Sequence, residues 1–210
     1  MTPTRVLPMF PLGTVLIPGA PLPLHVFEPR YRSLVQDCLA GEPEFGVVLI
    51  ERGSEVGGGD QRFAVGTLAR ITQVGESPDG RYVLTVVGVR RLRCVEWLPD
   101  APYPLARVEF PEDGEIAADA VARRDTASRR LRRLLALHAE LGDPVPSIDH
   151  ELPADPIAAV WAALVAAPLE VIDRQRVLEV DDPAARLSFL VDLLDAAVDA
   201  ATARLGAGGP

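Results

Sequence analysis

The sequence predicts an α+β protein, with a β-rich first half that contains one helix and a second half that is a small helical bundle. Two long apolar runs at residues 61–75 and 81–97 have the composition of strands, and Ser77-Pro78-Asp79-Gly80 is a typical turn between them. In the second half, alanine and leucine recur at helical spacing. The first half is therefore expected to be built around a hairpin, and the second around packed helices.

The composition changes at residues 111–114, where proline, two acidic residues and glycine follow one another. Beyond them, β-branched runs disappear and alanine and leucine become more frequent. We place the boundary between two subdomains here, with residues 1–112 in the first and 113–205 in the second. Residues 206–210 are rich in glycine and are expected to form a disordered tail.

The first forty residues are the stretch around which the chain is organised. Residues 6–10 are an apolar run, which predicts a strand, and residues 22–27 are mostly apolar and predict a second one. Pro29 is a favourable first residue of a helix, and Gly41 is placed to end that helix. Between the strands no helix is expected, because the segment is punctuated by Pro11, Gly13, Pro18, Gly19, Pro21 and Pro23.

The rest of the first half supplies the remaining strands. Residues 45–51 are apolar and bounded by glycines, which predicts a buried strand, and residues 53–60 are a glycine-rich loop. Residues 81–97 are apolar on both faces over their first half, so this strand is expected to be central. Residues 103–110 predict one more strand, entered and left through prolines.

Four helices are expected in the second half. The first covers residues 116–141 and stops at Gly142, with a stripe of leucines on one side. Asp155-Pro156 and Asp182-Pro183 each combine a capping aspartate with a first-turn proline, so each opens a helix. A short helix follows Pro168. Short loops between amphipathic helices are typical of a bundle.

Four parts of the sequence together resemble one known family. Residues 7–32, LPMFPLGTVLIPGAPLPLHVFEPRYR, are similar to the start of the Lon protease N-terminal (substrate-binding) domain, and closer still to free-standing bacterial proteins built on that domain. The resemblance continues at residues 63–74 and 79–94 and returns at 168–194, in the family's order. It implies a PUA-like β half, a helical second half and a role in holding protein substrates.

The composition excludes several catalytic classes. The chain contains no lysine, and all 21 of its basic residues are arginine. It therefore lacks the lysine of an ATP-binding P-loop and the Ser–Lys pair of the Lon peptidase domain. His25, His138 and His150 do not have the spacing of metal ligands. We expect no catalytic residue, no metal and no cofactor, and a protein that is not an enzyme.

Charge and cysteine content suggest the surroundings of the protein. A net charge of −9 argues against a general nucleic-acid binder, which needs a basic surface to neutralise phosphates. Two cysteines far apart in the sequence are typical of buried thiols in a reducing compartment. We find no apolar run long enough to span a membrane and no signal-peptide pattern at the start. The expected location is the cytoplasm.

The candidate binding surface lies in the organising stretch. The proline-rich loop has a restricted backbone, and the strand after it contains Pro23, which favours an edge position where an extended peptide can pair. Aromatic side chains offer apolar contact area without demanding a specific partner side chain. The predicted peptide-binding residues are Leu16, Ile17, Leu22, Phe27, Arg30 and Tyr31. The alternative for Phe27 and Tyr31 is simple burial in the core.

A polar cluster lies beside this surface. Glu28 is expected to pair with Arg32 one helical turn later, or with Arg91 or Arg93 from the long strand. These four residues predict a structural clasp between helix and sheet, and the alternative is the polar rim of a peptide groove.

Another cluster, Arg129, Arg130, Arg132 and Arg133, covers one side of its helix. It suits a docking face for acidic partners or RNA, or a solvated helix face neutralised in part by Asp192, Asp195 and Asp199.

Three functions remain open at this point. The first is a non-catalytic module that binds exposed apolar or unfolded segments of other proteins, as an adaptor in protein quality control. The second is a protein that binds a small molecule or metabolite, or an enzyme of unrecognised type, using a pocket in the β half. The third is RNA binding, which rests on analogy with other PUA-like folds.

Overall fold

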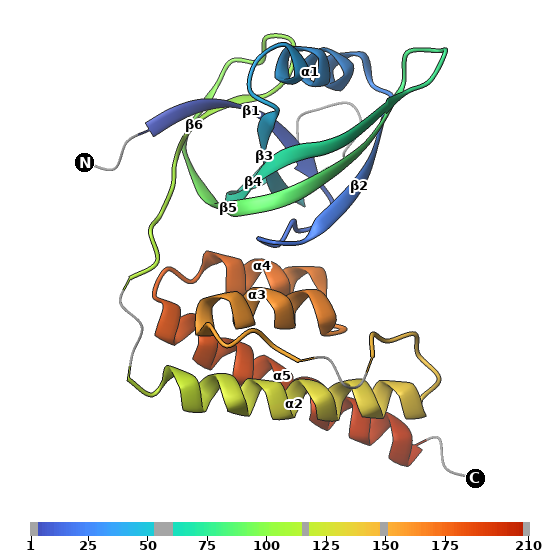
Figure 1. Ribbon diagram of the computed structural model, residues 1–210, viewed down its shortest axis with the longest axis vertical. Coiled ribbons are helices and arrows are strands. Elements are labelled where there is room, and N and C mark those ends of the chain that lie inside the picture. The colour runs from blue at the N-terminus through green and yellow to red at the C-terminus, as the bar shows by residue number, and fades with distance from the viewer. Residues whose placement is uncertain (1–3, 53–60, 115–117, 148–150, 208–210) are drawn as a thin grey trace. The chain divides into compact units, whose positions relative to one another are not determined.

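The computed structural model describes residues 4–52, 61–114, 118–147 and 151–207 (Figure 1). The chain forms two compact units, Met1–Glu112 and Asp113–Pro210, which we call the β unit and the helical unit. The division falls at the segment where the composition changes. The loop expected at residues 53–60 lies outside the described residues.

The described part of the β unit contains one sheet, and every strand predicted from the sequence is present in it. The strand order is β2-β5-β4-β3-β1-β6, and β6 also pairs with β5, so the sheet closes on itself (Figure 1). The strands are β1 Thr4–Leu12, β2 Pro21–Val26, β3 Glu44–Arg52, β4 Gln61–Glu76, β5 Tyr82–Leu98 and β6 Leu105–Glu109.

Strand β5 is the central strand, as the sequence predicts. Its first part pairs with β2 and its second part with β6, while β4 runs antiparallel to it over most of its length. The turn before it is closed by a hydrogen bond from the Gly80 amide to the Ser77 carbonyl at 2.8 Å, and Gly80 has a φ of 75°. Strand β2 pairs only with β5 and is an edge strand, as Pro23 predicts.

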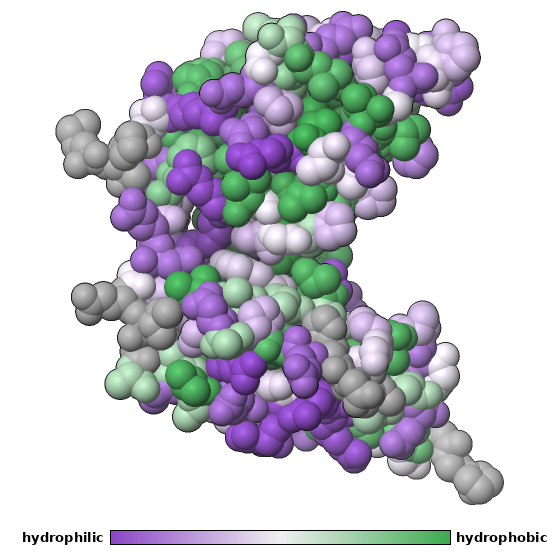
Figure 2. Space-filling view, viewed as in Figure 1, coloured by the Kyte–Doolittle hydropathy of each residue, from purple (hydrophilic) through white to green (hydrophobic). Residues whose placement is uncertain are grey.

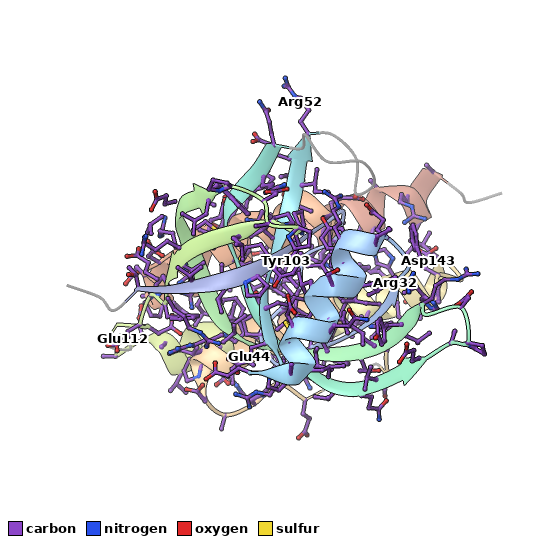
Figure 3. The ribbon with its side chains drawn as sticks, turned by 90° about the horizontal axis from the view of Figure 1, so that it is seen from above. Arg32, Glu44, Arg52, Tyr103, Glu112 and Asp143 are labelled. Carbon is purple, nitrogen blue, oxygen red and sulfur yellow. The ribbon has the colours of Figure 1, made fainter. Side chains whose placement is uncertain are left out.

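Helix α1, Pro29–Ala40, packs against the inside of the sheet through Tyr31, Leu34, Val35 and Cys38. It begins at Pro29 and ends at Gly41, as predicted. Two contacts fix its position. The Tyr31 ring stacks on the Phe10 ring of β1 with 4.1 Å between centroids. The Tyr103 hydroxyl donates to the Asp37 carboxylate at 2.6 Å, and Tyr103 is labelled in Figure 3.

The proline-rich loop between β1 and β2 is tied to the middle of the sheet. The Gly19 amide donates to the Gly88 carbonyl at 2.8 Å, and the Gly88 amide donates to the Ala20 carbonyl at 3.0 Å. A Cβ at Gly88 would lie 2.4 Å from the Ile17 carbonyl oxygen, so only glycine allows this approach. The Thr67 hydroxyl also donates to the Leu16 carbonyl, at 2.6 Å. The loop is therefore part of the packed structure.

The helical unit contains four helices among its described residues: α2 Ala120–Glu140, α3 Pro156–Ala166, α4 Val171–Glu179 and α5 Pro183–Ala207. Two capping predictions are confirmed, because the Asp155 carboxylate accepts from the Ala158 amide at 2.8 Å and Asp182 caps α5 in the same way.

Two boundaries predicted in the helical unit are wrong. Helix α2 begins at Ala120 and not at residue 116, because residues 118–119 form a turn. Helix α5 includes Gly206 and Ala207, which were assigned to the tail.

A fully buried arginine lies in the core of the helical unit. Arg186 has an exposed fraction of 0% and its guanidinium lies over the Trp161 ring, 4.7 Å from the centroid. It donates to the carbonyl oxygens of Val180 and Asp181 at 2.9 and 3.1 Å and pairs with the Asp113 carboxylate at 2.8 Å. The first residues of the helical unit are thus attached to its core by a charge-assisted contact.

Both thiols are reduced and poorly ionisable. Cys38 is buried on the side of α1 that packs against the sheet, and Cys94 is half-buried in β5. Burial raises the pKa of each thiol to about 12.

A candidate peptide-binding edge on the β unit

A pocket of about 250 Å³ runs beside the free edge of β2. One side is formed by β2 itself, from Pro23 to Val26, and by Phe27 after it. The other side comes from β1 and α1, through Phe10, Leu12 and Tyr31. The rings of Phe10 and Tyr31 stack on one another and form an aromatic, preformed floor of the pocket. We call it the edge pocket.

A second pocket, of about 240 Å³, lies where β2 ends next to the β4–β5 turn. It shares His25, Val26 and Phe27 with the edge pocket, and its other wall includes Ser77 and Arg81. Arg81 donates to the Asp79 carboxylate at 2.6 Å, and these hydrogen bonds from Arg81 hold the pKa of Asp79 below its ordinary value. We call this the turn pocket, and it is the more polar of the two.

Phe27 is the exposed apolar residue between the two pockets. Its exposed fraction is 54%, because it follows the last β2 residue and precedes the Pro29 that starts α1. Its aromatic side chain is therefore more than half exposed, and it lines both pockets. Such an anchor is common at surfaces that bind other proteins.

The outer face of β2 and β5 extends this apolar surface. Residues paired across antiparallel strands point to the same side of the sheet. The outer face therefore carries three pairs: Pro21 with Val87, Pro23 with Thr85, and His25 with Val83. The β2 members and Val83 are exposed, and hydrophobic residues are visible among hydrophilic ones on the surface of the β unit in Figure 2.

Three predicted binding residues are not on the surface. Leu16 and Ile17 have exposed fractions of 2% and 3%, because the loop that carries them is tied to Gly88 and turns their side chains inward. Tyr31 is 3% exposed and forms the floor of the edge pocket. The alternative of simple burial thus describes Tyr31 better than Phe27. We correct the candidate site by removing Leu16 and Ile17.

The other two predicted residues lie at the border of the site. Leu22 is half-buried and packs against the main core cluster of the β unit. The Arg30 guanidinium lies 4.5 Å from the Tyr31 ring centroid and is half-buried. Neither residue lines the edge pocket or the turn pocket.

The four residues of the predicted clasp between helix and sheet have other partners than those expected. Glu28 Oε2 pairs with Arg30 Nε at 3.1 Å, and not with Arg32. Arg93 pairs with Glu109 of β6 at 3.6 Å, and Arg91 is buried opposite Thr67 of β4. Arg32 instead lies against the β4–β5 turn, where a Cβ on Gly80 would be 2.2 Å from its Nη2 atom. The two long-strand arginines therefore contact neighbouring strands of the sheet and not Glu28.

Several site residues were not identified from the sequence. Phe10 was assigned to the strand at residues 6–10 and Leu12 to the proline-punctuated segment that follows, and nothing local shows that they border a pocket with residues of β2. Val83 was assigned to a central strand whose first half is apolar on both faces, but Val83 is exposed. The sequence signal for such an exposed apolar residue was that the first half of the strand at residues 81–97 is apolar on both faces.

The described residues of the site form two small pockets and no metal-binding cluster. Within the ranges described, no group of three or more histidine, cysteine or acidic side chains is placed to hold a metal. Both pockets are smaller than the roughly 300–1,000 Å³ of typical small-molecule sites.

In the described part of the chain, no helix is both long enough and apolar enough to cross a bilayer.

Comparisons with known proteins agree with this architecture. Residues 6–196 match the family described as the ATP-dependent protease La (LON) substrate-binding domain. The chain is 33% identical over 199 residues to Lon protease 2 of Myxococcus xanthus and 31% identical over 198 residues to Lon protease of Anaeromyxobacter dehalogenans. These alignments cover 91% and 90% of this chain, but only 24% and 23% of the relatives.

Solved structures show the same similarity. The Lon N-terminal domain protein from Xanthomonas campestris matches with a TM-score of 0.64 at 30% identity, covering 90% of this chain and 98% of that one. The N-terminal domain of a Mycobacterium avium complex Lon protease shares the fold, with a TM-score of 0.68 at 21% identity. The resemblance in the sequence is thus confirmed: the chain belongs to the Lon substrate-binding domain family.

Proposed function

We propose that the protein binds exposed apolar segments of other proteins along the free edge of β2, without catalysing a reaction. The observation that carries this proposal is the exposed Phe27 between the edge pocket and the turn pocket. Family membership supports a protein substrate, because the matched domain is described as substrate-binding.

The chemistry of the edge favours side-chain contacts over backbone pairing. Pro21 and Pro23 have no amide hydrogen, so two of the six β2 residues cannot donate to an added strand. The apolar floor of Phe10 and Tyr31 remains available to any bulky side chain. Recognition of this kind depends on apolar area and tolerates varied sequences, which suits a module that meets unfolded chains.

The adaptor role and the absence of catalysis are part of the same proposal. The chain has no lysine, so neither a P-loop nor a Ser–Lys dyad can be assembled from its own residues. We propose that it presents bound segments to a partner that carries the catalytic machinery. The closed sheet is consistent with the PUA-like fold that the resemblance implies. A cytoplasmic location stays a prediction.

The test uses Phe27→Ser, with Leu39→Ser as a matched control. Both residues are exposed and lie in the β unit, but Leu39 borders neither pocket. We expect Phe27→Ser to weaken binding of a fluorescent unfolded model protein about tenfold, because removal of a central aromatic anchor costs roughly 1–2 kcal/mol. Leu39→Ser should bind like the wild type.

The melting temperature separates binding from folding. Both variants should melt close to the wild type, because each replaces a residue that is about half exposed to solvent. Equal binding by Phe27→Ser and wild type would move the binding surface elsewhere. A sharp rise in melting temperature with one metabolite, in a screen of small molecules, would favour the small-molecule function instead.

A further inference from the structure

A row of arginines lies on the exposed side of α2. Arg129, Arg132 and Arg133 are exposed and are spaced three and four residues apart, so they are neighbours on the helix surface. Arg129 donates to the Thr126 hydroxyl at 2.9 Å. No described residue forms an ion pair with Arg132 or Arg133. Like charges at this spacing destabilise a helix unless another group compensates them.

A row of aspartates lies on α5 next to these arginines. Asp192, Asp195 and Asp199 are separated by three and four residues and share one side of the helix. Asp195 pairs with Arg130 of α2 at 2.5 Å, which shows that the two rows adjoin. Asp192 and Asp199 are exposed, and no ion pair with another described residue is seen for either.

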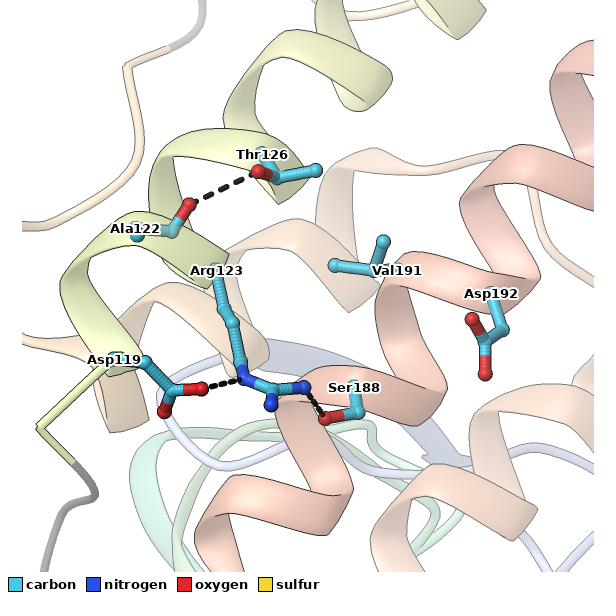
Figure 4. A pocket seen from close by; sticks show the side chains of 7 residues that line it. All are labelled: Asp119, Ala122, Arg123, Thr126, Ser188, Val191 and Asp192. Atoms are coloured by element: carbon cyan, nitrogen blue, oxygen red, sulfur yellow. Dashed lines mark hydrogen bonds and ion pairs between the residues drawn. The ribbon is translucent and has the colours of Figure 1, made fainter.

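The two helices run in the same direction and are in step. The Arg123 guanidinium donates to the Ser188 hydroxyl, and Arg130 pairs with Asp195 (Figure 4 shows the first contact). Both contacts join residues 65 positions apart, so α2 and α5 are parallel and residue n of α2 lies level with residue n + 65 of α5. By this rule, Arg133 lies almost level with Asp199.

A shallow groove of about 310 Å³ opens between the two helices at the start of α2 (Figure 4). Its rim is polar and includes Asp119, Arg123 and Asp192, while Ala122 and Val191 are its apolar members. The groove and the two charged rows together form what we call the charged face: one continuous surface of the helical unit with positive charge on α2 and negative charge on α5.

We propose that the charged face is the contact surface for a second copy of this chain. A two-fold axis parallel to the helices, between α2 and α5, places each α2 above the α5 of the other copy. Because the helices are in step, each arginine row then faces an aspartate row at the same level. The face is self-complementary, which is the requirement for an isologous dimer.

The expected dimer is weak and depends on salt. Helix α2 is about 30 Å long and two neighbouring helices are about 20 Å wide, so the face covers on the order of 600 Å² per copy. This lies at the lower end of specific interfaces. Exposed ion pairs lose strength when salt screens them, so dissociation should follow an increase in ionic strength.

The test is a charge swap with two variants, Arg133→Glu and Asp199→Arg. Each variant alone places like charges opposite one another and should sediment as a monomer, at concentrations where the wild type is partly dimeric in about 0.05 M salt. A one-to-one mixture of the two variants restores both opposite-charge contacts, and a dimer should reappear with an affinity within about tenfold of the wild type.

The controls are Arg52→Glu and Glu51→Arg. They change the net charge by the same amounts but lie exposed on β3 of the β unit. They should leave self-association unchanged, and circular dichroism should show that all four variants are folded. A wild type that stays monomeric at low salt overturns the proposal, even if it binds an acidic polymer. Variants that dimerise as well alone as in the mixture also overturn it.

Discussion

The two surfaces described above differ in how the chain builds them. The peptide-binding edge brings together residues from β1, β2, α1 and the β4–β5 turn, which are far apart in the sequence. The charged face comes from two helices, and the spacing of its residues along each helix shows the pattern directly. A surface made by helical periodicity can thus be recognised from sequence, while a pocket between strands needs the strand order first.

The same contrast applies to the forces that maintain each unit. The β unit depends on backbones that approach one another closely, at glycines in β4 and β5. The helical unit depends on side chains: capping aspartates, leucine stripes and the buried Arg186. Substitutions that add one methyl group should therefore be most harmful in the β unit, and substitutions that remove one side chain most harmful in the helical unit.

The largest effect is expected from Gly66→Ala in β4. An added Cβ would lie 2.1 Å from the Val47 carbonyl oxygen, which belongs to the backbone of β3 and cannot move without breaking the pairing. We expect a loss of about 3 kcal/mol or more in the free energy of unfolding, or failure to fold.

The matched control is Gly75→Ala in the same strand. There the added Cβ would be 3.9 Å from the Val83 carbonyl oxygen, an ordinary contact. Urea unfolding of both variants measures the difference. Equal midpoints for the two would show that β3 and β4 are not held as closely as the structure indicates.

A somewhat smaller effect is expected from Arg186→Ala in α5. The substitution leaves a void beside Trp161 and removes the ion pair with the Asp113 carboxylate, at a cost of about 3 kcal/mol. Arg176→Ala is the control, because Arg176 is exposed and its ion pair with Asp173 is worth ~0.5 kcal/mol. If the two variants unfold at the same urea concentration, the helical unit does not depend on its buried arginine.

The smallest effect concerns pH and the β unit. Partial burial opposes ionisation of Glu44, but hydrogen bonds from Arg70 and Arg5 outweigh it and hold the pKa below the ordinary value of 4.5. The carboxylate therefore stabilises the fold above the unfolded pKa, and this contribution is lost as the pH falls through the folded pKa.

Glu44→Gln measures this contribution. At neutral pH the variant should be less stable than the wild type by ~1 kcal/mol, since the arginine partners are partly exposed. The difference should shrink as the pH is lowered below about 4.5 and the wild-type carboxylate is protonated. A difference that is the same at both pH values would show that the charge of Glu44 is not what matters.

The fold could be predicted from the sequence because its signals are local. The apolar runs, the turn at residues 77–80 and the aspartate–proline caps each act on their own neighbours.

The site could be predicted only in part. Phe27 was assigned to the binding surface and is exposed, but Leu16 and Ile17 were placed on an exposed loop because prolines surround them. Hydrogen bonds to Gly88 and Thr67, distant in the sequence, reverse that interpretation.

The prediction of a clasp between helix and sheet was wrong for the same reason, because the partners are set by the fold and not by sequence spacing. Sequence spacing allowed Glu28 to pair with Arg32 on the next turn, but Arg30 lies closer and already stacks on Tyr31. Which of several arginines meets a carboxylate depends on where the sheet places each one, and spacing alone does not contain that information.

The low reactivity of its two thiols makes the protein convenient for chemical labelling. With a pKa of about 12, Cys38 and Cys94 are almost entirely protonated at neutral pH and react slowly with maleimides. The absence of lysine also removes side-chain amines from competition. A Phe27→Cys variant would thus carry one reactive thiol between the two pockets. A fluorophore attached there would report, by its change in emission, when a segment covers the edge of β2.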